Sequence, residues 1–272
     1  MQNGLEHEII WYPLKSFGVD NQFFALSGTT IISTWIALAI ILALCLLARS
    51  IFLRTHSENH EYQKLLLPPE FTFLTYGKYV ATSVIRSFMS LVEQSTGAFV
   101  HRYFNFIAAL FIFILICNWV ALIPYVEEPT KNLNTTLALG TIALLYIQKE
   151  IIKVHGFAHY LKEYFLPVST FFPLNLIIGL FFAPFKILGE LATVISLSFR
   201  LFGNIFGGAI IMQIWHNGIA SSLIWQLIST IGVHLGLVAF FVIFEGGLQA
   251  FVFTILTLTN ISMATAIEEG KH

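Results

Sequence analysis

Arg200 is the residue of this sequence whose chemistry most needs an explanation. It lies in the stretch ISLSFRLFGNIFGG, and apolar sequence extends well beyond it in both directions. An arginine at the centre of a bilayer costs about 2.5 to 3.5 kcal/mol on insertion scales, and the guanidinium group cannot lose its proton to avoid that cost. An arginine at a helix end could extend its charge to the lipid headgroups, but the long apolar flanks disfavour this. The pattern therefore predicts a fixed positive charge with a function.

Two polar residues share a helix face with this arginine. Ser196, Arg200 and Asn204 follow one another at intervals of four residues, which places them along one side of a helix. Three glycines lie close by, and small residues let a second helix approach closely in a membrane: Gly203, Gly207 and Gly208. The charged face could therefore meet another helix surface, although packing within the chain would explain the glycines equally well.

Glu245 is the second candidate site, because it is an ionisable carboxylate in the apolar stretch FFVIFEGGLQAFVF. On an α-helix Gln249 would lie one turn further along the same side, and His234 would lie within about 20° of the same line. Thr230 and Thr259 would fall within about 60° of it. A row of titratable and hydroxyl groups inside a membrane predicts a proton or ion path. His234 alone could instead be a hydrogen-bonded packing residue, and threonine is common in membrane helices for packing.

Glu190 and Lys186 are spaced as a helical i, i+4 pair. They could be a structural pair that partly neutralises itself, or Glu190 could contribute to an aqueous half-channel. Cys45 and Cys117 lie in apolar runs, which is typical of buried free thiols and not of a disulfide or metal site. The sequence predicts no metal and no cofactor.

The elements that position these residues are those of a membrane protein. The chain has 272 residues, of which 57% are hydrophobic and only 11% are charged. A soluble domain would carry about 25% charged residues. The net charge of -1 gives no reason to expect nucleic acid as a partner. We expect an all-α polytopic membrane protein that forms a single domain over residues 1–272.

The expected organisation has about five spanning helices and one helix in the membrane plane. An external segment (1–29) precedes a first span (30–53), and residues 76–102 have the spacing of an amphipathic helix at the interface, or else of a soluble linker helix. A helical hairpin (103–151) and an ion-path hairpin (171–266) follow. Basic residues cluster at the ends that this order places inside, so the N-terminus is expected outside and the C-terminus in the cytoplasm.

The ion-path hairpin is unusually long and apolar. Its two segments each run for roughly forty residues, so each helix would be about 60 Å long, twice the bilayer core. The sequence breaks between them at residues 216–218. Such helices must tilt steeply, kink or follow a re-entrant turn, and Pro173 and Pro184 could make that turn before Lys186.

Two stretches resemble a known family. Residues 196–208 (SLSFRLFGNIFGG) resemble the arginine signature of subunit a of F-type ATP synthases, and residues 247–257 (GLQAFVFTILT) resemble the glutamine signature of its last helix. Residues 172–176 and 118–124 match weaker patterns of the family in the expected order. The resemblance covers residues 76–266.

The resemblance implies a stator subunit that stands beside a rotating ring of c subunits and provides one aqueous half-channel on each side of the membrane. Arg200 would attract the deprotonated carboxylate of the ring and block leakage between the half-channels. Asn204, Gln249 and Glu190 match polar positions of the family. The implied partners are the c-ring, the peripheral stalk subunit b, the rest of the complex and membrane lipid, with a bacterial inner membrane favoured over a mitochondrial one. The subunit would not be an enzyme by itself.

This sequence departs from the family at two positions. Ala209 and Val242 stand where many members have a Glu or His. Glu245 lies three residues after Val242, about one helical turn along, and could substitute for the acid of the entry channel. A secondary transporter would also use midplane charges but predicts internal repeats, and a structural scaffold would leave Arg200 and Glu245 unexplained.

Overall fold

The computed structural model describes residues 10–11, 26–56, 83, 86, 89–90, 93–94, 100–123, 126–157, 160–162, 172–218 and 229–266. A two-residue pairing of β1 (Ile10–Trp11) with β2 (Leu26–Ser27) precedes the first helix, and every later element is helical. The elements that follow are α1 (Gly28–His56), α3 (Val100–Trp119), η4 (Val120–Leu122), η5 (Pro129–Lys131), α4 (Leu133–His155), α6 (Phe172–Gly218), η6 (Ser229–His234), α8 (Leu235–Val238), η7 (Ala239–Glu245) and α9 (Gly246–Ala266). This confirms the prediction of an all-α membrane protein.

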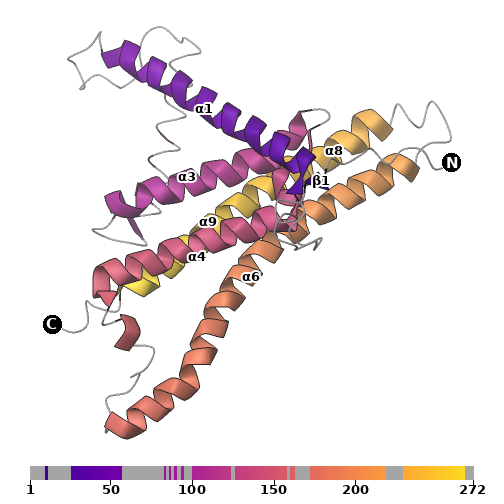
Figure 1. Cartoon of the computed structure of the whole chain (residues 1–272). Coiled ribbons are helices and arrows are strands. Elements are labelled where there is room, and N and C mark those ends of the chain that lie inside the picture. The colour runs from indigo at the N-terminus through magenta and orange to yellow at the C-terminus, as the bar shows by residue number, and fades with distance from the viewer. Residues whose placement is uncertain are drawn as a thin grey trace.

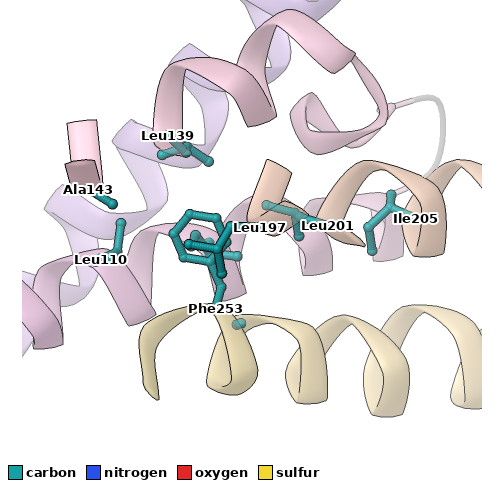
Figure 2. Close-up of a cluster of buried hydrophobic side chains, with 9 residues drawn as sticks. Leu110, Leu139, Ala143, Leu197, Leu201, Ile205 and Phe253 are labelled. Carbon is teal, nitrogen blue, oxygen red and sulfur yellow. The ribbon is translucent and has the colours of Figure 1, made fainter. Parts of the chain in front are cut away.

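The helices α3, α4 and α9 run side by side, while α6 leans against them and α1 extends away from the bundle (Figure 1). One apolar core joins α3, α4, α6 and α9, with the Phe253 ring between Leu110 and Leu197 (Figure 2). The side chains of Leu197, Leu201 and Ile205 lie four residues apart, so one face of α6 is buried against its neighbours. This packing fixes the rotation of α6 about its axis.

Four described helices are long and apolar enough to cross a membrane, over residues 28–49, 102–122, 178–215 and 232–264. The first contains most of the expected span 30–53, and the last two are the long segments of the expected ion-path hairpin. The expected fifth span corresponds to α4, whose 23 residues would extend about 35 Å. Its role as a span remains a prediction, and the expected in-plane helix over 76–102 falls mostly outside the described residues.

The predicted turn at Pro184 is wrong. The helix α6 is continuous over 47 residues, with Pro184 inside it and Pro173 near its start. A proline removes one backbone hydrogen bond, and in membrane proteins neighbouring helices and local adjustments satisfy the groups that it frees. The curved course of α6 in Figure 1 replaces the expected turn.

The two cysteines differ in their surroundings. Cys117 is a buried free thiol, as predicted, whereas Cys45 is free but exposed on α1. The prediction for Cys45 fails because an apolar run in a membrane helix need not face protein. The outer face of α1 also carries exposed apolar side chains such as Trp35 and Leu42, which suits contact with lipid.

Candidate functional site

Arg200 lies on the exposed side of α6. Leu201, the next residue, is fully buried, and each helical residue is turned by about 100° from its neighbour. Ser196 is exposed like Arg200, and Asn204 is half-buried, so the row of polar residues runs along the margin of the packed face. No ion pair involves Arg200 within the described part of the chain. The Arg200 side chain is therefore exposed and has no carboxylate partner among the described residues.

The glycines near Arg200 divide into two groups. At Gly203 and Gly207 an added Cβ atom would meet nothing within 4 Å among the described residues. At Gly208 an added Cβ would lie 2.9 Å from Cδ1 of Phe241, so this glycine permits close packing of α6 on η7. Gly208 thus serves packing within the chain. Gly203 and Gly207 leave the backbone of α6 uncovered by side chains beside Arg200, which gives a low surface there.

Asn204 and Gln249 are brought together by the packing of α6 on α9. Asn204 Nδ2 donates to Gln249 Oε1 over 3.0 Å. Gln249 is 1% exposed, and its own Nε2 has no hydrogen-bond partner in the described residues. The bond joins the Arg200 row of α6 to the polar residues of the last helix, one helical turn from Arg200.

Glu245 is the last residue of the π-helical turn η7, and it is half-buried. His234 ends the other π-helical turn, η6, and is also half-buried. The angular estimate that aligned these two residues assumed 100° for every step, and wider turns change that angle. The sequence-based alignment of His234 with Glu245 therefore does not follow from the structure. Thr259 is exposed and its hydroxyl donates to the carbonyl of Ile255, as in an ordinary membrane helix.

Glu190 and Lys186 are both half-buried on α6. They lie about three and about four turns before Arg200 on the same continuous helix.

The polar residues at the C-terminal end of α3 stand out in the sequence only as part of a weaker family pattern (118–124), which assigns no role to their side chains. Asn118 and Thr130 are buried and bonded to one another, and Asn118 and Trp119 donate to backbone carbonyls on either side of Glu245. An Asn-Trp pair at the end of an apolar span was a visible signal, but its partners lie more than 120 residues away.

The arrangement places an exposed arginine, a hydrogen-bonded amide pair and a half-buried carboxylate on two long apolar helices. The sequence of the chain matches the family described as ATP synthase A chain over residues 31–262. The chain belongs to this family.

Individual members of the family are similar in sequence to this chain over much of its length. An ATP synthase subunit a from Moorella thermoacetica is 32% identical over 235 residues, which cover 86% of this chain and 89% of that protein. One from Syntrophobacter fumaroxidans is 35% identical over 193 residues, covering 70% of each chain. One from Geobacter sulfurreducens is 37% identical over 178 residues, covering 65% of this chain and 69% of that protein. As a member of the ATP synthase A chain family, the chain is a component of that membrane complex.

Proposed function

We propose that this chain is the stator subunit that couples ion flow to rotation in an F-type ATP synthase, with Arg200 as the charge on which coupling depends. The observation that carries the proposal is the place of Arg200 on the exposed side of a long apolar helix, with no ion pair in the described part of the chain. Such a charge has a purpose if a carboxylate passes it on a second protein.

The proposed partner at this face is the ring of c subunits. An ion would enter one half-channel, neutralise a ring carboxylate, travel with the turning ring and leave through the other half-channel. Arg200 would attract each carboxylate after it loses its ion and would keep the two half-channels apart. The low surface at Gly203 and Gly207 would let a ring helix approach.

The remaining polar residues are assigned to the ion path. Glu245, Gln249, Asn204, Glu190, His234 and Ser196 would carry or border the half-channels. The Asn204–Gln249 bond supports a common path on α6 and α9. By itself the subunit would catalyse no reaction, and subunit b of the peripheral stalk would hold it against rotation.

We place the protein in a bacterial inner membrane, with its N-terminus outside and its C-terminus in the cytoplasm. Arg49, Lys149 and Lys153 lie near helix ends that this orientation puts inside, in agreement with the positive-inside rule. The comparisons lend no support to a secondary transporter.

The test compares Arg200→Ala with Lys149→Ala in purified complex reconstituted into vesicles. Lys149→Ala removes an exposed positive charge from α4 that has no ion pair among the described residues, and it is the control. Arg200→Ala should abolish ATP-driven proton pumping while passive proton flux under an imposed potential persists or rises. Lys149→Ala should retain pumping. Normal pumping by an assembled Arg200→Ala complex would overturn the proposal.

A further inference from the structure

The C-terminal end of α3 is bonded to the backbone on both sides of Glu245. Asn118 Nδ2 donates to the carbonyl of Gly246 over 2.8 Å, and Trp119 Nε1 donates to the carbonyl of Ile243 over 3.2 Å. These carbonyls belong to the residue after Glu245 and to the second residue before it. The bonds cross between segments that are more than 120 residues apart in the sequence.

The two bonds meet the end of the π-helical turn η7: Ile243 lies within this turn, and Gly246 is the first residue of α9. Turns of this kind are rare, and they interrupt the regular hydrogen-bond ladder of an α-helix. Backbone carbonyls buried away from water need partners, and in a membrane helix those partners must come from the protein. Asn118 and Trp119 supply two donors at the place where the ladder changes.

A third residue binds the Asn118 amide. Thr130 Oγ1 donates to Asn118 Oδ1 over 2.8 Å, and both side chains are almost completely buried, at 0% and 1% exposure. A backbone carbonyl can only accept, so the amide nitrogen must face Gly246, and the amide oxygen then faces the Thr130 hydroxyl group. Rotation of the amide would place its oxygen against the Gly246 carbonyl oxygen, and that bond would be lost.

The packing around these bonds is tightest at Gly246. A Cβ atom added there would lie 3.1 Å from Cβ of Asn118, closer than an ordinary contact, whereas one added at Gly247 would lie at the ordinary contact distance of 3.7 Å from Cζ2 of Trp119. The missing side chain at Gly246 lets the backbone approach the Asn118 amide closely. The sequence thus places the donors Asn118 and Trp119 on α3 opposite a backbone segment that carries no side chain at Gly246.

We infer that Asn118, Trp119 and Thr130 are positioning residues for Glu245. They hold the wide turn η7 in place, and this turn sets where the Glu245 carboxyl group stands on the last long helix. The inference rests on the proposed role of Glu245 in the ion path. It assigns to the short 3-10 helix η5, through Thr130, an effect on ion transfer although Thr130 itself touches no ion.

The test uses variants that differ by single donor atoms. Thr130→Val keeps the shape of the side chain and removes the hydroxyl group, whereas Thr130→Ser restores the donor. Trp119→Phe removes Nε1 and keeps an aromatic ring. The matched control is Thr141→Val, because the Thr141 hydroxyl donates only to the carbonyl of Leu137 within α4. Pumping is measured per assembled complex in vesicles.

Thr130→Val should lower the pumping rate about tenfold, the effect of one lost hydrogen bond in the active arrangement. Thr130→Ser and Thr141→Val should stay within about twofold of the original rate, because both keep the bonds to η7. The pumping rate of Trp119→Phe should lie between those of Thr130→Val and Thr130→Ser. Hydrogen exchange of the backbone amides in residues 239–247 should be faster in Thr130→Val and Trp119→Phe than in the original protein. If Thr130→Val does not assemble, Trp119→Phe carries the test.

The inference fails if Trp119→Phe and any assembled Thr130→Val both pump at the original rate. It also fails if Thr130→Ser loses as much activity as Thr130→Val, because the hydroxyl donor would then not be the cause. Glu245→Gln belongs in the same experiment. Normal pumping by Glu245→Gln would refute the proposed role of Glu245, whereas impaired pumping beside unaffected Thr130 and Trp119 variants would refute only the positioning role.

Discussion

Ser198 is a fully buried polar residue two positions before Arg200, and its hydroxyl has no hydrogen-bond partner in the part of the chain described. Burying such a hydroxyl costs about 1 to 3 kcal/mol by mutational measures. We predict that Ser198→Ala raises the stability of the complex by about 1 kcal/mol, because it removes the unpaired group and leaves little space. The measurement is the midpoint of thermal dissociation in detergent, with Ser196→Ala, an exposed serine, as control. A lower midpoint for Ser198→Ala would show that the hydroxyl has a partner.

The amide pair of Asn204 and Gln249 should act as a unit in ion transfer. Asn204→Leu and Gln249→Leu each remove one half of the 3.0 Å bond and leave the other half unpaired. We predict that each change alone lowers pumping about tenfold. The double variant should be no slower than the worse single one, because residues in one network do not contribute independently. Multiplied losses in the double variant would show that the two residues act separately.

Local spacing predicted some of these residues better than others. The row of Ser196, Arg200 and Asn204 could be predicted because α6 is one continuous α-helix, so intervals of four residues keep one face. The alignment of His234 with Glu245 assumed a regular α-helix, whereas two π-helical turns lie at these residues, so the alignment stays a prediction. The bond from Asn118 to Gly246 could not be predicted, since spacing within a helix carries no information about a partner 128 residues away.

At Gly140 the helix α4 lies in close contact with α6. A Cβ atom at this position would collide with Oγ of Ser198 and would lie 3.2 Å from the carbonyl oxygen of Val194. Because one obstacle is backbone, a rotamer change cannot relieve the contact, and α6 would have to move. We predict that Gly140→Ala costs about 1 to 3 kcal/mol of stability and also lowers pumping, since it shifts the helix that carries Arg200.

Gly189→Ala is the matched control for this change, because an added Cβ there meets nothing within 4 Å among the described residues. In a helix alanine is favoured over glycine by up to about 1 kcal/mol, so the control should not lower the dissociation midpoint. A Gly140→Ala complex as stable as the Gly189→Ala complex would mean that α4 and α6 are not in close contact.

The helices themselves were predictable where hydropathy alone decides. Long apolar runs gave the first span and the two long segments at the C-terminal end, because the bilayer requires about 20 apolar residues per crossing. The continuity of α6 through Pro184 could not be predicted, because it depends on what the rest of the protein provides around the helix. The same holds for the exposure of Cys45, which depends on which face of α1 meets protein.

Over the whole molecule, polar contacts fasten α3 at both of its ends. At the C-terminal end, Asn118 and Trp119 bind the last helix. At the N-terminal end, Arg102 forms an ion pair with Glu150 of α4 over 2.5 Å, and Lys153 lies 3.4 Å from the other oxygen of the same carboxylate. In a membrane, apolar side chains gain little by packing on one another instead of on lipid, so the apolar core does not by itself fix how far α3 is shifted along its neighbours. The polar contacts at its two ends set that position.

The ion pair at the N-terminal end of α3 leads to a prediction for the whole bundle. The Glu150 side chain is 3% exposed, whereas the Arg102 side chain is 36% exposed, so solvent screens one partner only. Arg102→Ala should cost about 1 to 3 kcal/mol, less than a fully buried pair, because it leaves a buried carboxylate with only Lys153 nearby. Glu150→Gln should cost less than Arg102→Ala, since it removes the buried charge itself and keeps an acceptor for Arg102.

Thermal dissociation midpoints of the two complexes give the comparison. Passive proton flux should stay normal in both, because the pair lies far along α3 from the bonds at Glu245. A larger loss for Glu150→Gln than for Arg102→Ala would show that the carboxylate charge has a further partner in the assembled complex.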